Sequence, residues 1–459
     1  MAPQTGASGG AILAFDAAQN ISETKVTNRW IQLIAGIIAM MAIANLQYAW
    51  TLFTGSLTMS LHASLAAIQV AFSGFVLAET WLLPFEGALI DWLGPRGMLA
   101  IGGVFVGVGW IGAGKAVSVT QLIVAYAIGG IGAGAVYGGS VGNTLKWFPD
   151  RRGLAVGLTS GAYGIGTALT VAPIARMIRS SGYGHTLVVW GIIQGIVVVA
   201  AALLLAKPPD GWAPPGWREK EAMQKPKVLR SYCNVTPRQM VRTRSFWAIY
   251  VMMTLMAFGG LAVTAQLSPI AKFYHVDKVV VAFGATALVL AIELDRILNG
   301  LTRPFFGWVS DHIGRENTMF IAFTAEGLFV FGLIHLIHHP VWFITLSGFT
   351  FFAWGEIYSL FPSITADLFG EKWATTNYGI VYTSKGLASI FAGPVAALAS
   401  VHTGKWIGVF WMMIACDLTA AIMALVWLKP NTRHTIARCQ QMASSDQAPA
   451  TLIASHSGS

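Results

Sequence analysis

The chain has the composition of a protein that crosses a membrane many times. Its 459 residues are 55% hydrophobic and only 11% charged, and the formal net charge is +9 at pH 7. So apolar a composition excludes an ordinary soluble domain. The polar ends are short and no catalytic constellation is evident, so we expect no enzymatic activity.

Apolar stretches of about 20 residues, the length that crosses a hydrocarbon core of about 30 Å, recur along the chain. We predict twelve membrane spans in two groups of six. The first group covers residues 30–53, 66–90, 97–115, 119–142, 153–177 and 185–206, and the second covers residues 244–267, 280–306, 316–337, 341–364, 374–400 and 405–428. The expected fold class is therefore an all-α membrane protein of two six-helix bundles.

Polar segments divide the chain into five expected parts. Residues 207–243, rich in Pro, Lys and Arg, are expected to form a cytoplasmic linker between the bundles 30–206 and 244–428. Residues 1–29 and 429–459 are expected to be mobile cytoplasmic tails.

The basic residues predict the orientation in the membrane. With the N-terminus inside, about twenty of the 29 Lys and Arg residues lie on the cytoplasmic side and about six outside. Anionic lipid then accounts for the net charge, so the expected partner is the bilayer and not nucleic acid. The cysteines lack metal spacing, and the histidines at 335, 338 and 339 suit an interfacial turn, so we expect no metal or cofactor.

Two motifs recur in both halves of the chain. Residues 83–96 and 303–315 share Pro, Phe, Gly, Asp and Gly at an offset of 220 residues. Residues 148–151 and 369–372 match at an offset of 221. Two motifs repeated at nearly one spacing indicate that the second bundle repeats the first.

The loop pattern Gly-x-x-x-Asp-x-x-Gly-(x)-Arg resembles the signature of the major facilitator superfamily. It contains Asp91 and Arg96 in one half, and Asp311 and Arg315 in the other. The resemblance implies a substrate site near the bilayer midplane, between the halves, and alternating access by rocking. The structural alternative is a capped, ion-paired turn. We expect both roles, with each aspartate stabilising a neighbouring helix N-terminus and holding one gate state.

Two cations, Arg303 and Lys385, fall inside predicted spans near mid-bilayer. A charge at that depth costs about 3 kcal/mol on insertion scales. Their counterparts in the repeat are Leu83 and Gly164, so the fold itself does not require them. An arginine fork and a lysine point charge suit a small anion, especially a dicarboxylate. An ion pair or a side chain that reaches the interface is the alternative.

The segments around these two cations resemble the oxalate/formate antiporter family. The matching residues are 46–52, 136–138, 162–164, 299–305, 354–363, 377–379 and 382–391. The resemblance implies that Arg303 and Lys385 bind substrate carboxylates. It also implies a pocket lined by Gln47, Tyr48, Tyr137, Tyr163, Trp354 and Tyr358, to which we add Tyr382, where the family has Trp. For any one aromatic residue, ordinary helix packing is the alternative.

Acidic residues depart from that family pattern. Glu293, Asp295 and Arg296 lie in span eight where the characterised oxalate exchanger is uncharged, and Glu356 is a further acid. We expect Glu293 to pair with Arg296 at i, i+3. Glu356 is expected either to form a structural pair or to carry a proton. Further acids in or near spans are Glu79, Glu86, Glu326 and Asp417.

These observations predict a monomeric secondary transporter of a bacterial inner membrane, multi-pass, with both termini cytoplasmic. It would exchange small carboxylate anions, oxalate for formate or similar, and Arg303 and Lys385 would bind them. Two unneutralised cations would make the empty carrier resist closing, which favours obligatory exchange. The alternative is a proton-coupled symporter for formate, lactate or pyruvate that uses a buried acid such as Glu356.

Overall fold

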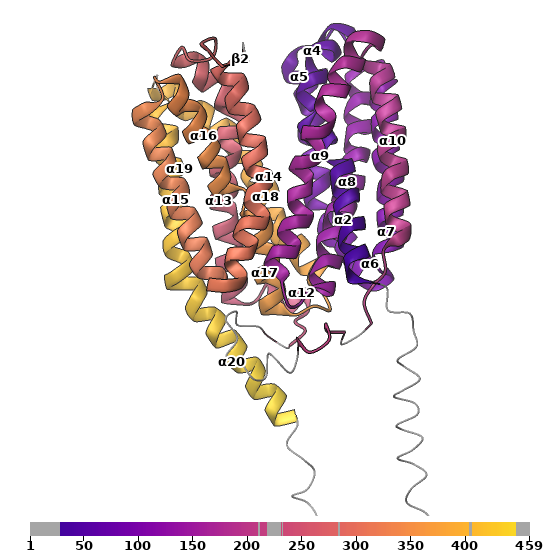
Figure 1. The fold of residues 1–459 in the computed structure, drawn as a ribbon, viewed down its shortest axis with the longest axis vertical. Coiled ribbons are helices and arrows are strands. Elements are labelled where there is room, and N and C mark those ends of the chain that lie inside the picture. Colours follow the sequence, from indigo (N-terminus) through magenta and orange to yellow (C-terminus); the bar gives the residue numbers. More distant parts are fainter. Residues whose placement is uncertain are drawn as a thin grey trace, which may run out of the picture.

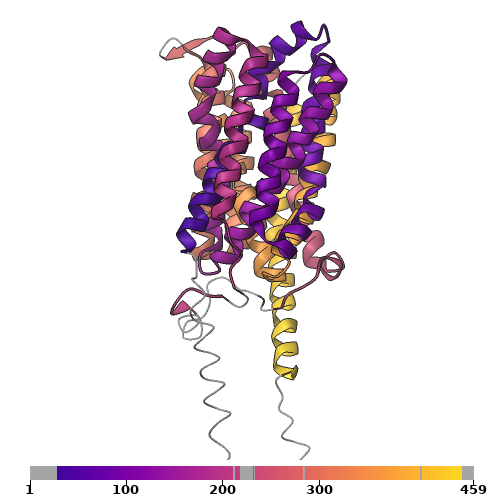
Figure 2. The ribbon, with the colours of Figure 1, turned by 90° about the vertical axis from the view of Figure 1, so that its right-hand side faces the viewer.

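The computed structural model describes residues 28–209, 212–217, 231, 233–282, 285–403 and 406–446. The described residues exclude 1–27, most of the expected linker and 447–459. The mobility expected of those tail residues therefore lies outside the description. The described helices gather in two groups that stand side by side, one indigo to magenta and the other orange to yellow (Figure 1). Figure 2 shows that the helices of both groups run along the same long axis.

The first group contains the helices that coincide with spans one to six. They are α2 (Arg29–Ile43), α3 (Asn45–Tyr48), α4 (Trp50–Ser60), α5 (Leu65–Trp81), α6 (Leu83–Leu93), α7 (Pro95–Gly114), α8 (Val119–Trp147), α9 (Arg152–Ser181) and α10 (Tyr183–Leu204). Span two is interrupted between α5 and α6, where Pro84 occupies the first turn of the new helix. Proline lacks the N–H that would continue the preceding helix, so a break is favoured there.

The second group coincides with spans seven to twelve. Its elements are α13 (Arg244–Phe273), α14 (Ala287–Ile313), α15 (Arg315–Leu336), α16 (Pro340–Trp354), α17 (Ile357–Phe369), α18 (Ala374–Thr403), α19 (Ile407–Met423) and the π-helix η2 (Ala424–Leu428). A short helix, α12 (Pro237–Met240), precedes them within the expected linker.

One expected span begins later in the structure than predicted. The strands β1 (Val280–Ala282) and β2 (Ala285–Thr286) pair antiparallel, so the helix of span eight begins seven residues later than expected, at Ala287. Valine favours strands, which suits this apolar hairpin. At the other end, residues 429–446, which belong to the expected C-terminal tail, are helical. They form α20 (Lys429–Asp446), which continues α19 through η2 and extends beyond the bundle (Figure 1).

Within the described residues, seven helical stretches are each long and apolar enough to cross a membrane, or eight if the bent α9 is one span. Three of the other expected spans fall short for local reasons. α5–α6 and α16–α17 are interrupted, and α14 carries five charged residues.

The repeated loop ends α6 and α14 in the same way. Gly94 and Gly314 follow these helices with φ of +88° and +91°, a region that side chains rarely adopt. The glycine lets the chain turn sharply into α7 and α15. Asp91 and Asp311 are thereby placed in the last turn of α6 and of α14.

Each of these aspartates caps a helix of the opposite half. Asp91 accepts hydrogen bonds from the backbone N–H of Thr376 at 2.8 Å and of Thr375 at 3.4 Å, at the start of α18. Asp311 accepts from Gly153 N at 3.0 Å and Leu154 N at 2.9 Å, at the start of α9. A carboxylate is favoured at a helix N-terminus, where the N–H groups are unsatisfied and the dipole is positive. The two halves are thus joined reciprocally at this end.

Buried ion pairs complete this junction. Arg315 donates to Asp311 at 2.6 Å and to Asp367 at 2.8 Å. Asp367 also binds Arg152 of the other half, at 2.5 Å. Lys146 lies 2.6 Å from Asp91. Arg96, for which we expected a gating or structural role, donates to the carbonyl of Leu205 at 3.0 Å, within the first group.

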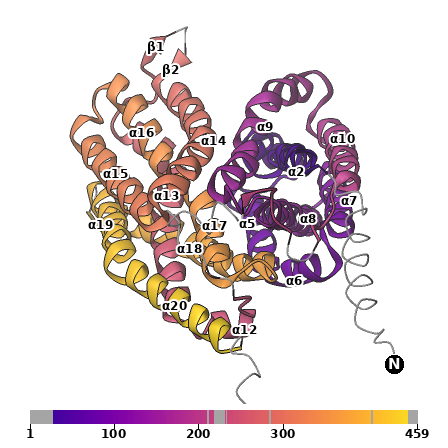
Figure 3. The same cartoon turned by 60° about the horizontal axis from the view of Figure 1, so that its bottom comes forward.

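The helices α9 and α14 run in contact above this junction, as the view from below shows (Figure 3). Gly161 makes that approach possible, because a Cβ atom built there would lie 2.7 Å from the carbonyl oxygen of Gly300. Larger residues at this point would separate the two halves.

Substitution of Asp311 by Asn should weaken the junction between the two halves. The amide keeps one acceptor but loses the charge that favours the α9 N-terminus and Arg315, worth about 1.5–3 kcal/mol. We expect a Thr375→Cys probe, buried in the junction, to react with a maleimide at least several-fold faster in Asp311→Asn, with Cys233, Cys416 and Cys439 replaced by Ser. Glu293→Gln, which breaks an exposed pair on the same helix, is the control. Equal rates in both variants would contradict the capping role.

Candidate functional site

Arg303 lies on α14 where this helix faces α9. Only 2% of its surface is exposed. Its Nη1 donates to the carbonyl oxygen of Ser160 on α9 at 2.6 Å, and its Nη2 donates to Asn299 Oδ1 at 2.9 Å. The Nε donor has no hydrogen-bond partner among the described residues. The guanidinium therefore keeps free donors at the boundary between the halves.

Lys385 lies on α18 and is also buried, with 3% of its surface exposed. Its Nζ donates to the hydroxyl of Tyr382 at 2.9 Å. The nearest carboxylate is that of Glu79 on α5, whose Oε2 lies 3.9 Å from Nζ. Lys385 is thus paired loosely across the boundary between the halves, and its ammonium has donors to spare.

Tyr358 brings the two cations together. Its ring lies 4.4 Å below the Arg303 guanidinium and 5.5 Å from Lys385 Nζ, measured to the ring centroid. Lys385 also lies 5.0 Å from the ring of Tyr382. The electron-rich faces of these rings offset part of the repulsion between two positive charges.

Further tyrosines extend this cage into the first half. Tyr137 on α8 stacks on Tyr382 with ring centroids 5.0 Å apart, and it lies 6.2 Å from Tyr163 on α9. Tyr48 packs edge-on against Tyr163 at 5.2 Å. The Tyr163 hydroxyl donates to Gln47 Oε1 at 3.0 Å. Six of the seven residues expected to line a pocket are therefore brought together by five helical segments from both halves.

Trp354 is the exception among the expected lining residues. Its Nε1 donates to the carbonyl of Met256 at 2.9 Å, so this donor is already used within the second half. Its ring lies edge-on to Tyr358, with centroids 5.6 Å apart. Trp354 therefore supports the ring that joins the two cations.

The acids of span eight lie apart from this cage. Glu293 is exposed and pairs with Arg296 at 3.4 Å, which confirms the expected i, i+3 contact. Asp295 is buried, and its Oδ1 has no hydrogen-bond partner among the described residues. Glu293 and Arg296 pair with each other, and among the described residues neither they nor Asp295 form an ion pair with Arg303 or Lys385.

Glu356 occupies the break between α16 and α17, fully buried. Neither of its carboxylate oxygens has a hydrogen-bond partner in the described part of the chain. Two other buried acids lie in the same half, Glu326 on α15 and Asp417 on α19, and both approach Gly259 of α13. This acid group lies inside the second half, and the structure gives Glu356 no basic partner there.

Sequence reasoning missed Tyr378 and the position of Glu79. Tyr378 lies 5.5 Å from Tyr382, and its hydroxyl is 3.5 Å from that of Tyr137. The spacing of Tyr378, Tyr382 and Lys385 at i, i+4 and i+7 is a helical face and could have revealed it. Glu79 lies 220 residues before Asn299, so one side chain beside each cation occupies an equivalent position in the repeat.

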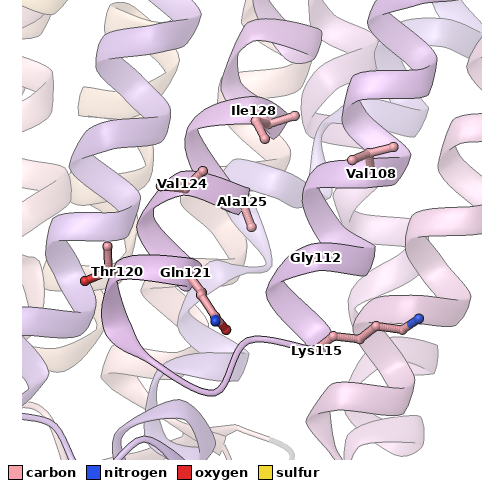
Figure 4. A pocket seen from close by; sticks show the side chains of 8 residues that line it. All are labelled: Val108, Gly112, Lys115, Thr120, Gln121, Val124, Ala125 and Ile128. Atoms are coloured by element: carbon pink, nitrogen blue, oxygen red, sulfur yellow. The ribbon is translucent and has the colours of Figure 1, made fainter.

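A surface groove lies elsewhere, between the ends of α7 and α8 (Figure 4). Val108 and Val124 line it and are 48% and 55% exposed, so it opens on the outer face of the bundle. Lys115 is its charged residue, and none of the cage residues takes part. Among the residues that the structure describes, no group of three His, Cys, Asp or Glu side chains could hold a metal ion.

The fold and the buried cationic cage are those of a multi-pass membrane transporter. A profile of the Major Facilitator Superfamily matches residues 33–294 and 296–444, and the chain belongs to this superfamily. It is 33% identical over 379 residues to the "Oxalate:formate antiporter" of Oxalobacter formigenes, covering 82% of this chain and 86% of that protein, and belongs to the same family.

Two more distant relatives place this family in context. "Monocarboxylate transporter 12" of Mus musculus is 22% identical over 376 residues, 77% of this chain and 76% of that protein. The solved structure of the proton:xylose symporter XylE superposes with a TM-score of 0.66 at 15% identity, covering 87% of this chain and 96% of that one. The latter likeness concerns the fold alone.

Replacement of Tyr358 tests the cage without a substrate. A cation–π contact in a desolvated site is worth about 2 kcal/mol. We expect Tyr358→Leu to lower the Tm of the purified protein by several degrees more than Phe343→Leu, a buried ring lost away from the cations. Tyr358→Phe keeps the ring and should stay close to wild type. If Tyr358→Phe lowered the Tm as much as Tyr358→Leu, the hydroxyl and not the ring would be the stabilising group.

Proposed function

We propose that this chain exchanges small carboxylate anions, oxalate for formate or similar, by alternating access. The observation that carries the proposal is the pair of buried cations, Arg303 and Lys385, held over one tyrosine ring at the boundary between the halves. Each would bind one carboxylate. The relationship to an oxalate:formate antiporter supports this substrate class.

The donors left free on the two cations suit that role. Arg303 keeps Nε, and each Nη carries a second hydrogen beyond the one donated to Ser160 or Asn299. Nε and Nη2 form a planar fork that matches a carboxylate. Lys385 offers its remaining ammonium hydrogens. The surrounding rings exclude water, which strengthens each contact.

The junction at Asp91 and Asp311 would form the cytoplasmic gate. The excess of basic residues at this end supports a bacterial inner-membrane protein with both termini cytoplasmic. In the present arrangement the halves are joined below the cations, so substrate would enter from the opposite side. We propose that a single chain is the transporting unit, because the cage is built from its two halves.

Counterflow in proteoliposomes tests the binding role. We expect Arg303→Lys, which keeps the charge but loses the fork, to reduce oxalate and malonate exchange about tenfold to hundredfold, because a hydrogen bond to a charged group is worth about 1.5–3 kcal/mol. Formate, lactate and pyruvate should lose less. Lys385→Arg, the reciprocal replacement of one cationic side chain by the other, is the matched variant. Equal losses for all five anions would mean that Arg303 has a structural role.

A second candidate function is proton-coupled symport of a monocarboxylate. The observation that favours it is the group of buried acids, Glu326, Glu356 and Asp417, none of which has an ion-pair partner among the described residues. The relationship to a monocarboxylate transporter agrees with it. One of these acids, with Glu356 first, would carry the proton.

An imposed pH gradient separates the two functions. If exchange is the function, an inward proton gradient across empty vesicles should not drive accumulation of formate, lactate or pyruvate, and Glu356→Gln should retain oxalate–formate counterflow. Accumulation that depends on the gradient, and that Glu356→Gln abolishes, would establish symport instead. Exchange needs an anion inside the vesicles, so it is absent from empty ones. Vesicles loaded with substrate anion therefore serve as the control that the protein is active.

A further inference from the structure

Asn299 holds the Arg303 guanidinium from one turn earlier on the same helix, α14. The amide is buried, with 5% of its surface exposed, and its Oδ1 accepts a hydrogen bond from Arg303 Nη2 at 2.9 Å. Arg303 Nη1 donates to the carbonyl oxygen of Ser160 at 2.6 Å. Because a guanidinium is rigid and planar, two directed bonds to different nitrogens fix both its position and its plane. Arg303 is therefore oriented before any anion arrives.

Asn299 is itself confined by the break between α16 and α17. A Cβ atom built at Gly355 would lie 2.8 Å from Asn299 Nδ2 and 2.9 Å from the Asn299 carbonyl oxygen. The break packs this closely because Gly355 has no side chain. The same break leads into Tyr358, whose ring centroid lies 4.4 Å from the guanidinium carbon of Arg303. The amide is thus held between the glycine on one side and the arginine on the other.

One hydrogen-bonding group of the Asn299 amide is left unpaired. Nδ2 has no hydrogen-bond partner among the described residues. Turning the amide over would place Nδ2 against Arg303, so that two donors would face each other. The bond to Arg303 therefore sets the orientation of the amide, although it leaves a buried donor unsatisfied, which is unfavourable. Asparagine is also a poorer helix former than alanine or leucine. The helix gains little from this residue, whereas Arg303 gains a fixed acceptor.

A neutral acceptor suits a cation that is to bind an anion. A carboxylate at position 299 would also orient Arg303, but it would cancel the charge that attracts the substrate. The amide oxygen orients the guanidinium without neutralising it. Nε and the second hydrogen of each terminal nitrogen stay available. Asn299 and Arg303 together thus form a preoriented fork for a carboxylate.

We propose that Asn299 is a positioning residue of the substrate site, which fixes the plane of the Arg303 fork and thereby favours dicarboxylates over monocarboxylates. This inference rests on the proposed exchange of carboxylates. A dicarboxylate that bridges Arg303 and Lys385 needs both cations at a set distance and orientation, and any freedom of the guanidinium is lost when it binds. A monocarboxylate meets one cation and can follow it. Fixing Arg303 in advance therefore helps the dicarboxylate most.

Titration calorimetry on the purified full-length protein gives the first test. We expect Asn299→Ala to weaken oxalate binding about threefold to tenfold, the cost of ordering one freed side chain, and to weaken formate binding less than about twofold. Asn299→Asp should weaken the binding of both anions, because the new carboxylate pairs with Arg303. Asn143→Ala is the matched control. It removes another buried amide, which donates to Gln32 at 3.4 Å in the first half, and should keep the wild-type ratio of the two affinities.

A double-mutant cycle with Arg303→Lys gives the second test. Lysine has no planar fork for an amide to orient. In the Arg303→Lys background, Asn299→Ala should therefore cause no further loss of oxalate affinity. A residue that only supported the fold would weaken binding by the same factor in both backgrounds. Non-additive losses therefore separate a positioning role from a structural one.

The outcomes separate this inference from the proposed function. If the wild-type protein binds neither oxalate nor formate, the proposed function is wrong. If it binds both, and Asn299→Ala weakens the two equally or weakens oxalate binding in the Arg303→Lys background as well, the function stands and the positioning role is refuted. Retained formate binding shows that Asn299→Ala is folded. If this variant does not fold, Asn299→Leu, which has the same branched shape without an acceptor, takes its place with the same expected change.

Discussion

The burial of two positive charges in one apolar interior is the constraint on which this molecule depends. Arg303 and Lys385 each need compensation, and most of it comes from neutral groups: a backbone carbonyl, an amide oxygen, a phenol hydroxyl and two ring faces. Such partners reduce the cost of burial without cancelling the charge. A positive interior of this kind suits the anion binding proposed above.

The gate and the site share the same helices. α14 carries Arg303 and, two turns on, Asp311, while α18 carries Lys385 and begins at the cap supplied by Asp91. Arg303 also reaches Ser160 across the boundary between the halves. A movement that frees either cap must therefore shift a cation. In the proposed exchange, neutralisation of the cations by substrate and rocking of the halves would in this way be mechanically linked.

Sequence reasoning reached the fold and most of the cage, for identifiable reasons. Hydropathy and the internal repeat predicted the helices. The repeated loop motif, with its glycines at 94 and 314, predicted that both aspartates lie at the end of a helix. It missed the hairpin at 280–286, because an apolar run there suits strand and helix alike. It also missed the pairing of Glu79 with Lys385, since contacts between helices of different halves leave no periodic signal.

The C-terminal helix α20 would move with the second half of the molecule. α19, η2 and α20 follow one another without a gap from Ile407 to Asp446. The first two turns of α20 pack against the bundle, where Thr432 and Ile436 are buried, and its far end extends beyond the bundle (Figure 1). At 1.5 Å per residue α20 is about 27 Å long. It continues from α19 in the half that carries both cations, so its far end moves when that half tilts. A 10° tilt of that half would swing its far end by about 5 Å, turning a small rearrangement inside the membrane into a displacement readable outside it.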